Sequence, residues 1–81
     1  MYISDNYSIF VNLLNIFVLL QSKKNIDKND IINYLEKIKY KNLIKNKYEL
    51  LLFNAIIDFL KNNYNSKNIE DVKLFIDTIK N

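Results

Sequence analysis

The chain contains no cysteine, histidine, glycine, proline, tryptophan or arginine among its 81 residues. Without cysteine it has no disulfide framework of the kind that stabilises small secreted domains. Without cysteine and histidine it also lacks the side chains that most often bind metals, act as nucleophiles or transfer protons. No glycine-rich loop is present to hold a phosphate group. We therefore expect no metal, no cofactor, no small-molecule substrate and no enzymatic activity.

The carboxylates of the chain do not change this expectation. An EF-hand calcium loop needs ligands at positions 1, 3 and 5, a glycine at 6 and a glutamate at 12, and the acidic residues that follow Asp27 do not have this spacing. Helix capping by Asp27 and Asp30 accounts for the same residues. Asp58 is the only carboxylate in a strongly apolar neighbourhood, and we interpret it as a helix-edge residue near Lys61.

Four residue types dominate the composition, since Asn, Lys, Ile and Leu together make up 50 of the 81 residues. Such an excess, combined with the missing glycine, proline and arginine, is typical of codon bias in a very AT-rich genome. The net charge of +3 comes from lysine alone. Because proteins that read nucleic-acid bases favour the bidentate arginine side chain, this charge by itself is weak support for a nucleic-acid partner.

The length predicts a single domain over residues 1–81. A chain this short buries only about 60% of the surface that its unfolded state exposes, so we expect marginal stability. The hydrophobic content of 49% is that of a globular protein and not of a disordered one. With disulfides and metals excluded, oligomerisation or very close helix packing is left as the further source of stability.

Helical periodicity predicts an all-α protein, a compact four-helix bundle with helices at about residues 5–21, 28–40, 47–63 and 69–80. Residues suited to the N-cap precede the helices: Ser4 or Asp5 for the first, Asp27 for the second and Asn68 for the fourth. Asp30 adds a second carboxylate in the first turn of the second helix, where it meets the positive end of the helix dipole.

A weak internal repeat suggests how the helices pair. The sequence DIINYLEKIK at residues 30–39 resembles DVKLFIDTIK at residues 71–80. Each copy follows a strongly apolar helix that has a tyrosine near its start, Tyr7 in one case and Tyr48 in the other. Two similar helical hairpins, each joining an apolar helix to an amphipathic one, are therefore one form that the bundle could take.

The segment from Ile9 to Leu20 is the longest uncharged apolar run in the chain. Its length of about 12 residues is too short to cross a bilayer, which takes roughly 20. No lysine precedes the run and no small-residue cleavage site follows it, so it does not have the pattern of a signal peptide. We expect a cytoplasmic protein without a membrane span.

The first and third helices carry more apolar residues than one buried face requires. The outer face of a helix in a small bundle is ordinarily charged, and an exposed apolar patch usually marks an interface. We therefore predict a homodimer or protein-partner interface, across which the two asparagines could hydrogen-bond. Its candidate residues are Val11, Asn12, Asn15, Leu19, Leu50 and Ile57.

A lysine-rich segment follows the second helix. Five lysines and interleaved aromatic residues are typical of a groove for single-stranded nucleic acid or for an acidic protein surface. Lysines at the C-terminal end of a helix are also explained by the helix dipole alone. Both interpretations stay open for this basic patch, which consists of Lys37, Lys39, Tyr40, Lys41, Lys45 and Lys47.

Taken together, these features favour a small non-enzymatic module that acts by occupying the surface of a partner protein. Small helical chains without motifs are common among phage and mobile-element proteins, so one concrete hypothesis is an inhibitor of a host defence complex, of the anti-CRISPR kind. Lysine-rich helical bundles that give immunity to bacteriocins are a second hypothesis. A nucleic-acid-binding protein that uses Lys37 to Lys47 is the third. The first two hypotheses are analogies of class and rest on no family motif.

Overall fold

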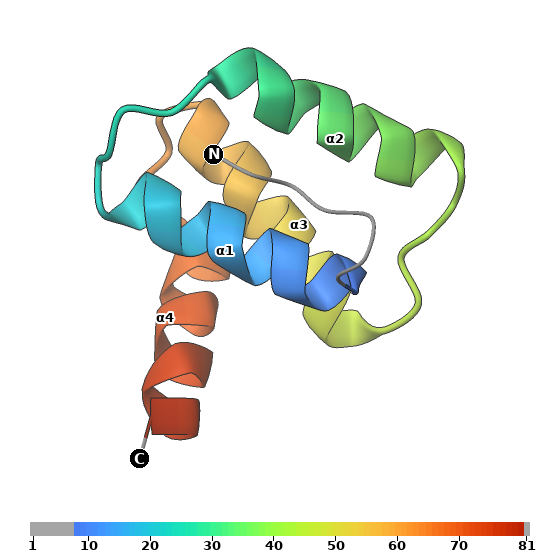
Figure 1. The fold of residues 1–81 in the computed structure, drawn as a ribbon. Helices are drawn as coiled ribbons and strands as arrows, with labels where there is room; N and C mark the ends of the chain where they lie inside the picture. The colour runs from blue at the N-terminus through green and yellow to red at the C-terminus, as the bar shows by residue number, and fades with distance from the viewer. Residues whose placement is uncertain (1–7, 81) are drawn as a thin grey trace.

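The computed structural model describes residues 8–80, and this part of the chain contains α-helices and no β-strand (Figure 1). The Cα radius of gyration is 11.9 Å, close to the roughly 12 Å of a compact domain of this length. The predicted all-α fold is confirmed as a four-helix bundle. The helices are α1 (Ile9–Gln21), α2 (Lys28–Tyr40), α3 (Lys47–Leu60) and α4 (Lys67–Lys80).

Helix α3 is the centre of the bundle. The backbones of both α1 and α4 pack closely against it. Helices α1 and α2 run in opposite directions across one side of the molecule, and the second half of α4 extends away from the other three helices (Figure 1). No comparably close backbone packing joins α2 to any other described helix. The two hairpins that the sequence repeat suggested therefore differ in packing, since the backbones of α3 and α4 approach closely and those of α1 and α2 do not.

Side-chain caps explain where the first three helices begin. Asp27 caps α2 as predicted, because its carboxylate accepts a hydrogen bond from the Asn29 amide at 2.9 Å. Asn46 caps α3 by accepting from the amides of Tyr48 and Glu49. Ser8 caps α1 through the Val11 amide, and the predicted N-caps Ser4 and Asp5 lie outside the described residues.

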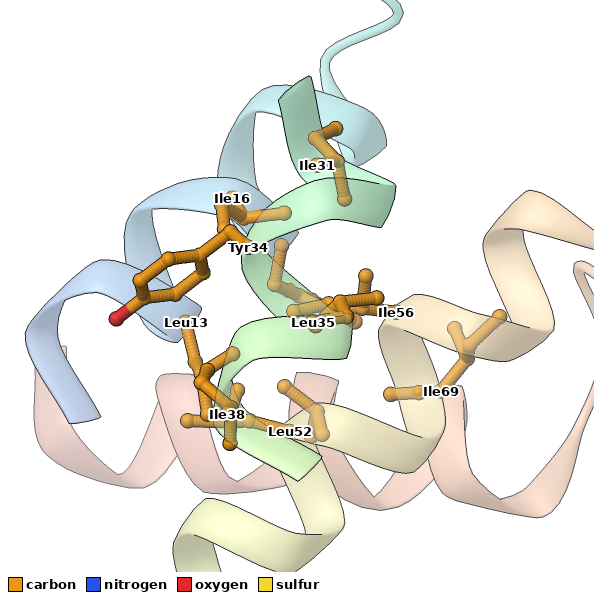
Figure 2. Close-up of a cluster of buried hydrophobic side chains, with 12 residues drawn as sticks. Leu13, Ile16, Ile31, Tyr34, Leu35, Ile38, Leu52, Ile56 and Ile69 are labelled. Carbon is orange, nitrogen blue, oxygen red and sulfur yellow. The ribbon is translucent and has the colours of Figure 1, made fainter. Parts of the chain in front are cut away.

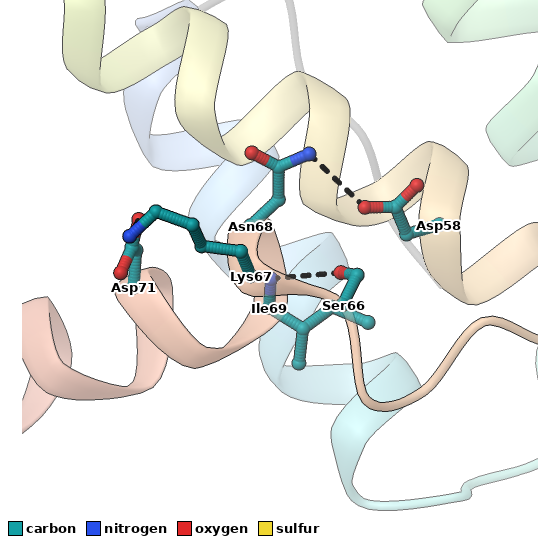
Figure 3. A network of polar contacts seen from close by, with 6 residues as sticks. All are labelled: Asp58, Ser66, Lys67, Asn68, Ile69 and Asp71. Carbon is teal, nitrogen blue, oxygen red and sulfur yellow. Dashed lines mark hydrogen bonds and ion pairs between the residues drawn. The ribbon is translucent and has the colours of Figure 1, made fainter.

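The start of α4 differs from the prediction. Its N-cap is Ser66, whose hydroxyl oxygen accepts from the Ile69 amide at 3.1 Å, so the helix begins at Lys67 and not after Asn68. The Asn68 side chain instead donates to Asp58 at 3.1 Å and ties α4 to α3 (Figure 3). Asp58 is thus a structural residue between two helices, and its partner is Asn68.

The helix ends show how the chain turns without glycine. Lys23, Asn42 and Asn62 adopt positive φ angles of 56°, 53° and 63° directly after the C-caps of α1, α2 and α3. The amide of Asn62 then bonds to the Phe59 carbonyl, as in a Schellman motif. This turn ends α3 at Leu60, three residues earlier than predicted.

Twelve buried side chains from all four helices form one hydrophobic core (Figure 2). Their spacing follows the helical period, so each helix presents one apolar stripe to the centre. The core residues are Leu13, Ile16, Phe17, Ile31, Tyr34, Leu35, Ile38, Leu52, Ala55, Ile56, Ile69 and Val72.

Aromatic contacts attach α4 to the bundle. The Phe75 ring stacks on Tyr48 of α3 with a centroid distance of 5.3 Å. It also meets Phe10 of α1 edge-on at 6.1 Å. Ile76 packs against the core, whereas Ile79 in the last turn of α4 is largely exposed.

One buried polar contact joins α1 to α2. The Asn12 amide nitrogen donates to the Tyr34 hydroxyl at 2.9 Å, and both side chains are buried. Hydrogen bonding offsets the cost of placing these polar groups in the interior. Among residues 8–80, no helix is long and apolar enough to cross a membrane.

Candidate functional site

A groove of about 790 Å³ runs between α2 and α3, and we call it the α2–α3 groove. It exists because the backbone of α2 is not closely packed on α3. Side chains of the core close its floor, and apolar side chains of both helices line its walls. The apolar residues around it are Ile32, Leu35 and Ile38 of α2, Ile44 of the α2–α3 connection, and Leu50, Phe53, Ile57 and Leu60 of α3.

The sequence of α3 produces one wall of this groove. Leu50, Phe53, Ile57 and Leu60 recur at intervals of three and four residues, which places them along one side of the helix. A second stripe, which includes Leu52, Ala55 and Ile56, faces the core. Helix α3 therefore has two apolar faces, and the groove face is only partly covered. Leu50 is 49% exposed.

The opposite wall comes from α2. Ile31 faces the core and is fully buried, whereas its neighbour Ile32 is exposed beside the groove. The helical periodicity of residues 28–40 does not by itself single out Ile32 as a surface residue. The sequence does contain a signal for an exposed isoleucine, the adjacent pair Ile31 and Ile32, because two neighbouring residues cannot both lie on one narrow face of an amphipathic helix.

Polar groups rim the groove. Glu36 and Lys39 belong to α2, and Lys61 follows α3. None of these three charges forms an ion pair within the part of the chain that the structure describes. The amides of Asn42 and Asn54 also line the groove. The rim thus offers two cations, one anion and two neutral hydrogen-bonding groups around an apolar centre.

The predicted interface residues divide into separate locations. Leu50 and Ile57 both line the α2–α3 groove. Val11 and Asn15 are exposed on the outer face of α1, and Leu19 on the same helix is half-buried. These residues lie on two surfaces, so the sequence grouped side chains that do not form one patch.

Asn12 requires a correction. It was expected to hydrogen-bond across an interface, but only 3% of it is exposed. Its amide is directed inward because Tyr34 of α2 provides a hydroxyl acceptor in the interior. Asn12 therefore belongs to the fold and not to a surface.

The outer face of α1 keeps the uncharged character expected from the sequence. Val18 is 43% exposed and lies near Val11 and Asn15 on this face. No charged residue occurs between Ile9 and Gln21. The homodimer expected there stays a prediction.

The basic patch is spread over several hollows of the surface. Lys39 lines the α2–α3 groove, Lys37 and Lys45 line a hollow beside α1, and Lys37, Lys39 and Tyr40 together line a further hollow on α2. Lys41 is the C-cap of α2, and the Lys47 ammonium lies 5.2 Å from the Tyr48 ring centre. Tyr40 is exposed at the end of α2. A nucleic-acid site made of this segment stays a prediction.

The α2–α3 groove combines an apolar centre with a polar rim. Among residues 8–80, no group of three or more Asp, Glu, His or Cys side chains is arranged to hold a metal ion. An apolar centre with polar groups at its rim is the usual form of a surface that recognises a protein or peptide. Comparison with protein-family models, with curated proteins and with solved structures finds no match to this chain.

Proposed function

We propose that this protein is a protein-binding module, and that its α2–α3 groove binds an amphipathic helix of a partner protein. One observation carries the proposal. The groove brings together Leu50 and Ile57, which belong to the predicted interface, and Lys39, which belongs to the predicted basic patch. Recognition of a helix in a groove depends on apolar anchors repeated every three or four residues.

The dimensions of the groove support a helical occupant. From Leu50 to Leu60 its α3 wall spans about 15 Å at a rise of 1.5 Å per residue. Anchors at positions i, i+4 and i+7 of a bound helix extend over about 10 Å. A helix of about three turns, roughly 16 Å long, thus matches the length of the apolar wall. The exposed side chains of Ile32 and Leu50 stand on opposite walls, where they would contact it from both sides.

The charged residues at the rim of the groove determine which residues we expect beside the apolar stripe of the partner helix. Lys39 and Lys61 outnumber Glu36 at the rim, and the remaining lysines of the basic patch continue from the C-terminal end of α2 to the start of α3. Such a surface favours an acidic partner and increases its rate of association. The expected occupant therefore has an apolar stripe bordered by Asp and Glu.

A module of this kind acts by covering a surface that its partner needs. The AT-biased composition of the chain is what phage and mobile-element proteins often have. We extend the proposal to an inhibitor that occupies an acidic helix of a host defence complex. Support for this extension comes from composition and from the groove. A bacteriocin-immunity role would use the same groove against a different partner.

Selection from a peptide library tests the proposal. A library of displayed helical peptides about four turns long, with randomised positions, is selected against the intact protein. The enriched peptides are expected to share an apolar i, i+4, i+7 pattern flanked by acidic residues. In the Leu50→Lys variant their affinity should fall at least tenfold, because an exposed apolar residue of the groove wall is replaced by a charge.

Val18→Lys is the matched control. Val18 is 43% exposed and Leu50 is 49% exposed, so both variants place a lysine at a similarly exposed apolar position, but on different faces. The control should leave peptide affinity unchanged. Equal losses in the two variants, or enrichment of peptides with no apolar pattern, would contradict the groove as the binding site. Self-association of the protein that Leu50→Lys abolishes would instead identify a second copy as the occupant.

A further inference from the structure

A second pocket, of about 570 Å³, lies where the connection between α1 and α2 meets α4. We call it the lysine pocket. Lys23, Lys24 and Lys28 line it from the end of α1 to the start of α2. Lys73 lines it from the second turn of α4, 45 residues later in the sequence. It shares no lining residue with the α2–α3 groove.

The charge of this pocket has one sign. Four of the twelve lysines of the chain line it, and no aspartate or glutamate does. None of the four lysines forms an ion pair within residues 8–80. Like charges gathered without counter-charges oppose folding through their mutual repulsion. A bound anion would remove this repulsion, which makes the lysine pocket a candidate anion site.

The floor of the pocket is aromatic and apolar. Phe59 and Tyr64 line it together with Leu20 and Ile26. The two rings lie 5.9 Å apart with an interplanar angle of 55°. Tyr64 is 53% exposed, and its hydroxyl donates to the Asn62 side chain at 2.6 Å. This hydrogen bond holds the tyrosine ring in place and leaves part of it accessible to a planar ligand.

Lysines around an aromatic floor match a ligand that has an anionic part and a flat ring. We propose that the lysine pocket binds a nucleotide unit, with its phosphate among Lys23, Lys24, Lys28 and Lys73 and its base against Tyr64. Stacking of bases on aromatic side chains combined with basic residues along the backbone is the usual way in which single strands are bound without sequence preference. The same chemistry recognises a free nucleotide. A simple inorganic anion would use the lysines and leave the aromatic floor uncovered.

This site differs from the nucleic-acid hypothesis drawn from the sequence. That hypothesis used the segment from Lys37 to Lys47, none of whose residues lines the lysine pocket. Without glycine the phosphate would be held by side chains as point charges and not by a backbone loop. Binding is therefore expected to weaken strongly with salt and to depend little on which base is present.

Binding measurements with four probes test the proposal. Adenosine monophosphate, a single-stranded oligothymidine, adenosine and inorganic phosphate are titrated into the intact protein at low salt by calorimetry. Tight binding of the monophosphate identifies a free nucleotide as the ligand. Binding of the oligothymidine alone identifies a unit of single-stranded nucleic acid. In either case adenosine and phosphate should bind at least tenfold more weakly, since adenosine lacks the phosphate group and inorganic phosphate lacks the base.

Variants locate the site. Lys73→Glu is expected to weaken nucleotide binding at least tenfold, and the milder Lys73→Met should weaken it in the same direction while keeping the apolar stem. Tyr64→Leu should weaken it about tenfold by removing the stacking surface. Lys41→Glu changes the net charge by the same amount as Lys73→Glu but lies in the basic patch, and it should have little effect. Circular dichroism confirms that each variant is folded.

Three results would overturn the proposal. The first is that neither nucleotide probe binds at low salt. The second is that phosphate binds as tightly as the nucleotides, which would leave the aromatic floor without a role. The third is that Lys41→Glu weakens binding as much as Lys73→Glu, which would move the site to the segment from Lys37 to Lys47. Binding to the α2–α3 groove is unaffected by all three, so the two proposals fail separately.

Discussion

Replacing Lys23 by glycine should stabilise the protein. Lys23 follows the C-cap of α1 with a φ angle of 56°, which is the left-handed region where an L-residue with a Cβ atom is strained. Its amide bonds to the Leu20 carbonyl at 3.2 Å, and glycine keeps that hydrogen bond. The substitution therefore removes strain without removing a backbone contact.

The expected gain follows from two opposing terms. The left-handed conformation costs a residue such as lysine about 1–2 kcal/mol, which glycine avoids. Glycine also increases the conformational entropy of the unfolded chain, which lowers stability by about 0.4–1 kcal/mol. The difference predicts that Lys23→Gly raises the free energy of unfolding by about 0.5–1 kcal/mol. For a domain of this size that corresponds to a rise of about 2–8 °C in Tm.

Urea unfolding and thermal melts measure this gain, and Lys24→Gly is its control. Lys24 is the next residue in the same connection and carries the same charge, but it does not have a positive φ angle. Both variants remove one lysine charge from the same pocket, but at Lys24 glycine relieves no backbone strain, so its entropic cost of about 0.4–1 kcal/mol is not offset by such relief. Asn42→Gly and Asn62→Gly should give smaller gains than Lys23→Gly, because asparagine tolerates the left-handed region. A loss of stability in Lys23→Gly equal to that in Lys24→Gly would refute the reasoning.

Two further predictions concern the interior and the outer face of α1. Tyr34→Phe removes the hydroxyl that accepts from Asn12 and should lower the free energy of unfolding by about 1–3 kcal/mol. A double-mutant cycle with Asn12→Ala should give a coupling of at least about 0.5 kcal/mol, and strictly additive losses would contradict the contact. If the uncharged outer face of α1 forms the predicted homodimer, sedimentation should show a dimer that Val11→Lys dissociates and Leu50→Lys preserves. A wild-type monomer at all concentrations would remove that interface.

The helices could be predicted from the sequence because their signals are local. Apolar residues at helical spacing located all four helices, and Asp27 marked the start of α2 correctly. The helix ends have weaker local signals, because the chain has no glycine or proline to mark a stop. Helix α3 ends at Leu60 because Asn62 adopts the left-handed conformation, which an asparagine permits but does not require.

Tertiary contacts determine the N-cap of α4 and the burial of Asn12, and local sequence signals do not indicate either. Ser66 and Asn68 are both good N-cap residues. Ser66 caps α4 because Asn68 is bonded to Asp58 of another helix (Figure 3). Asn12 likewise has the composition of a surface residue, and only the position of Tyr34 directs it into the interior. No local pattern contains this information.

The candidate sites required knowledge of which helices are neighbours. Periodicity placed Leu50 and Ile57 away from the core face of α3, but it did not indicate that they would lie opposite Ile32 of α2. It also could not indicate that Lys73 of α4 and Lys23 of the α1–α2 connection line one pocket, because the two residues lie 50 positions apart in the sequence. A sequence defines the faces of a helix, whereas the packing of helices decides which faces meet.

Mapping of a bound helix by NMR tests the α2–α3 groove most directly. An acidic amphipathic peptide from the library selection is titrated into isotope-labelled protein, and the chemical shift of each backbone amide is followed. The groove predicts the largest changes at Ile32, Leu50 and Ile57, with little change at Val11 and Val18 on the outer face of α1. Largest changes along α1, with the groove unaffected, would contradict the proposed function.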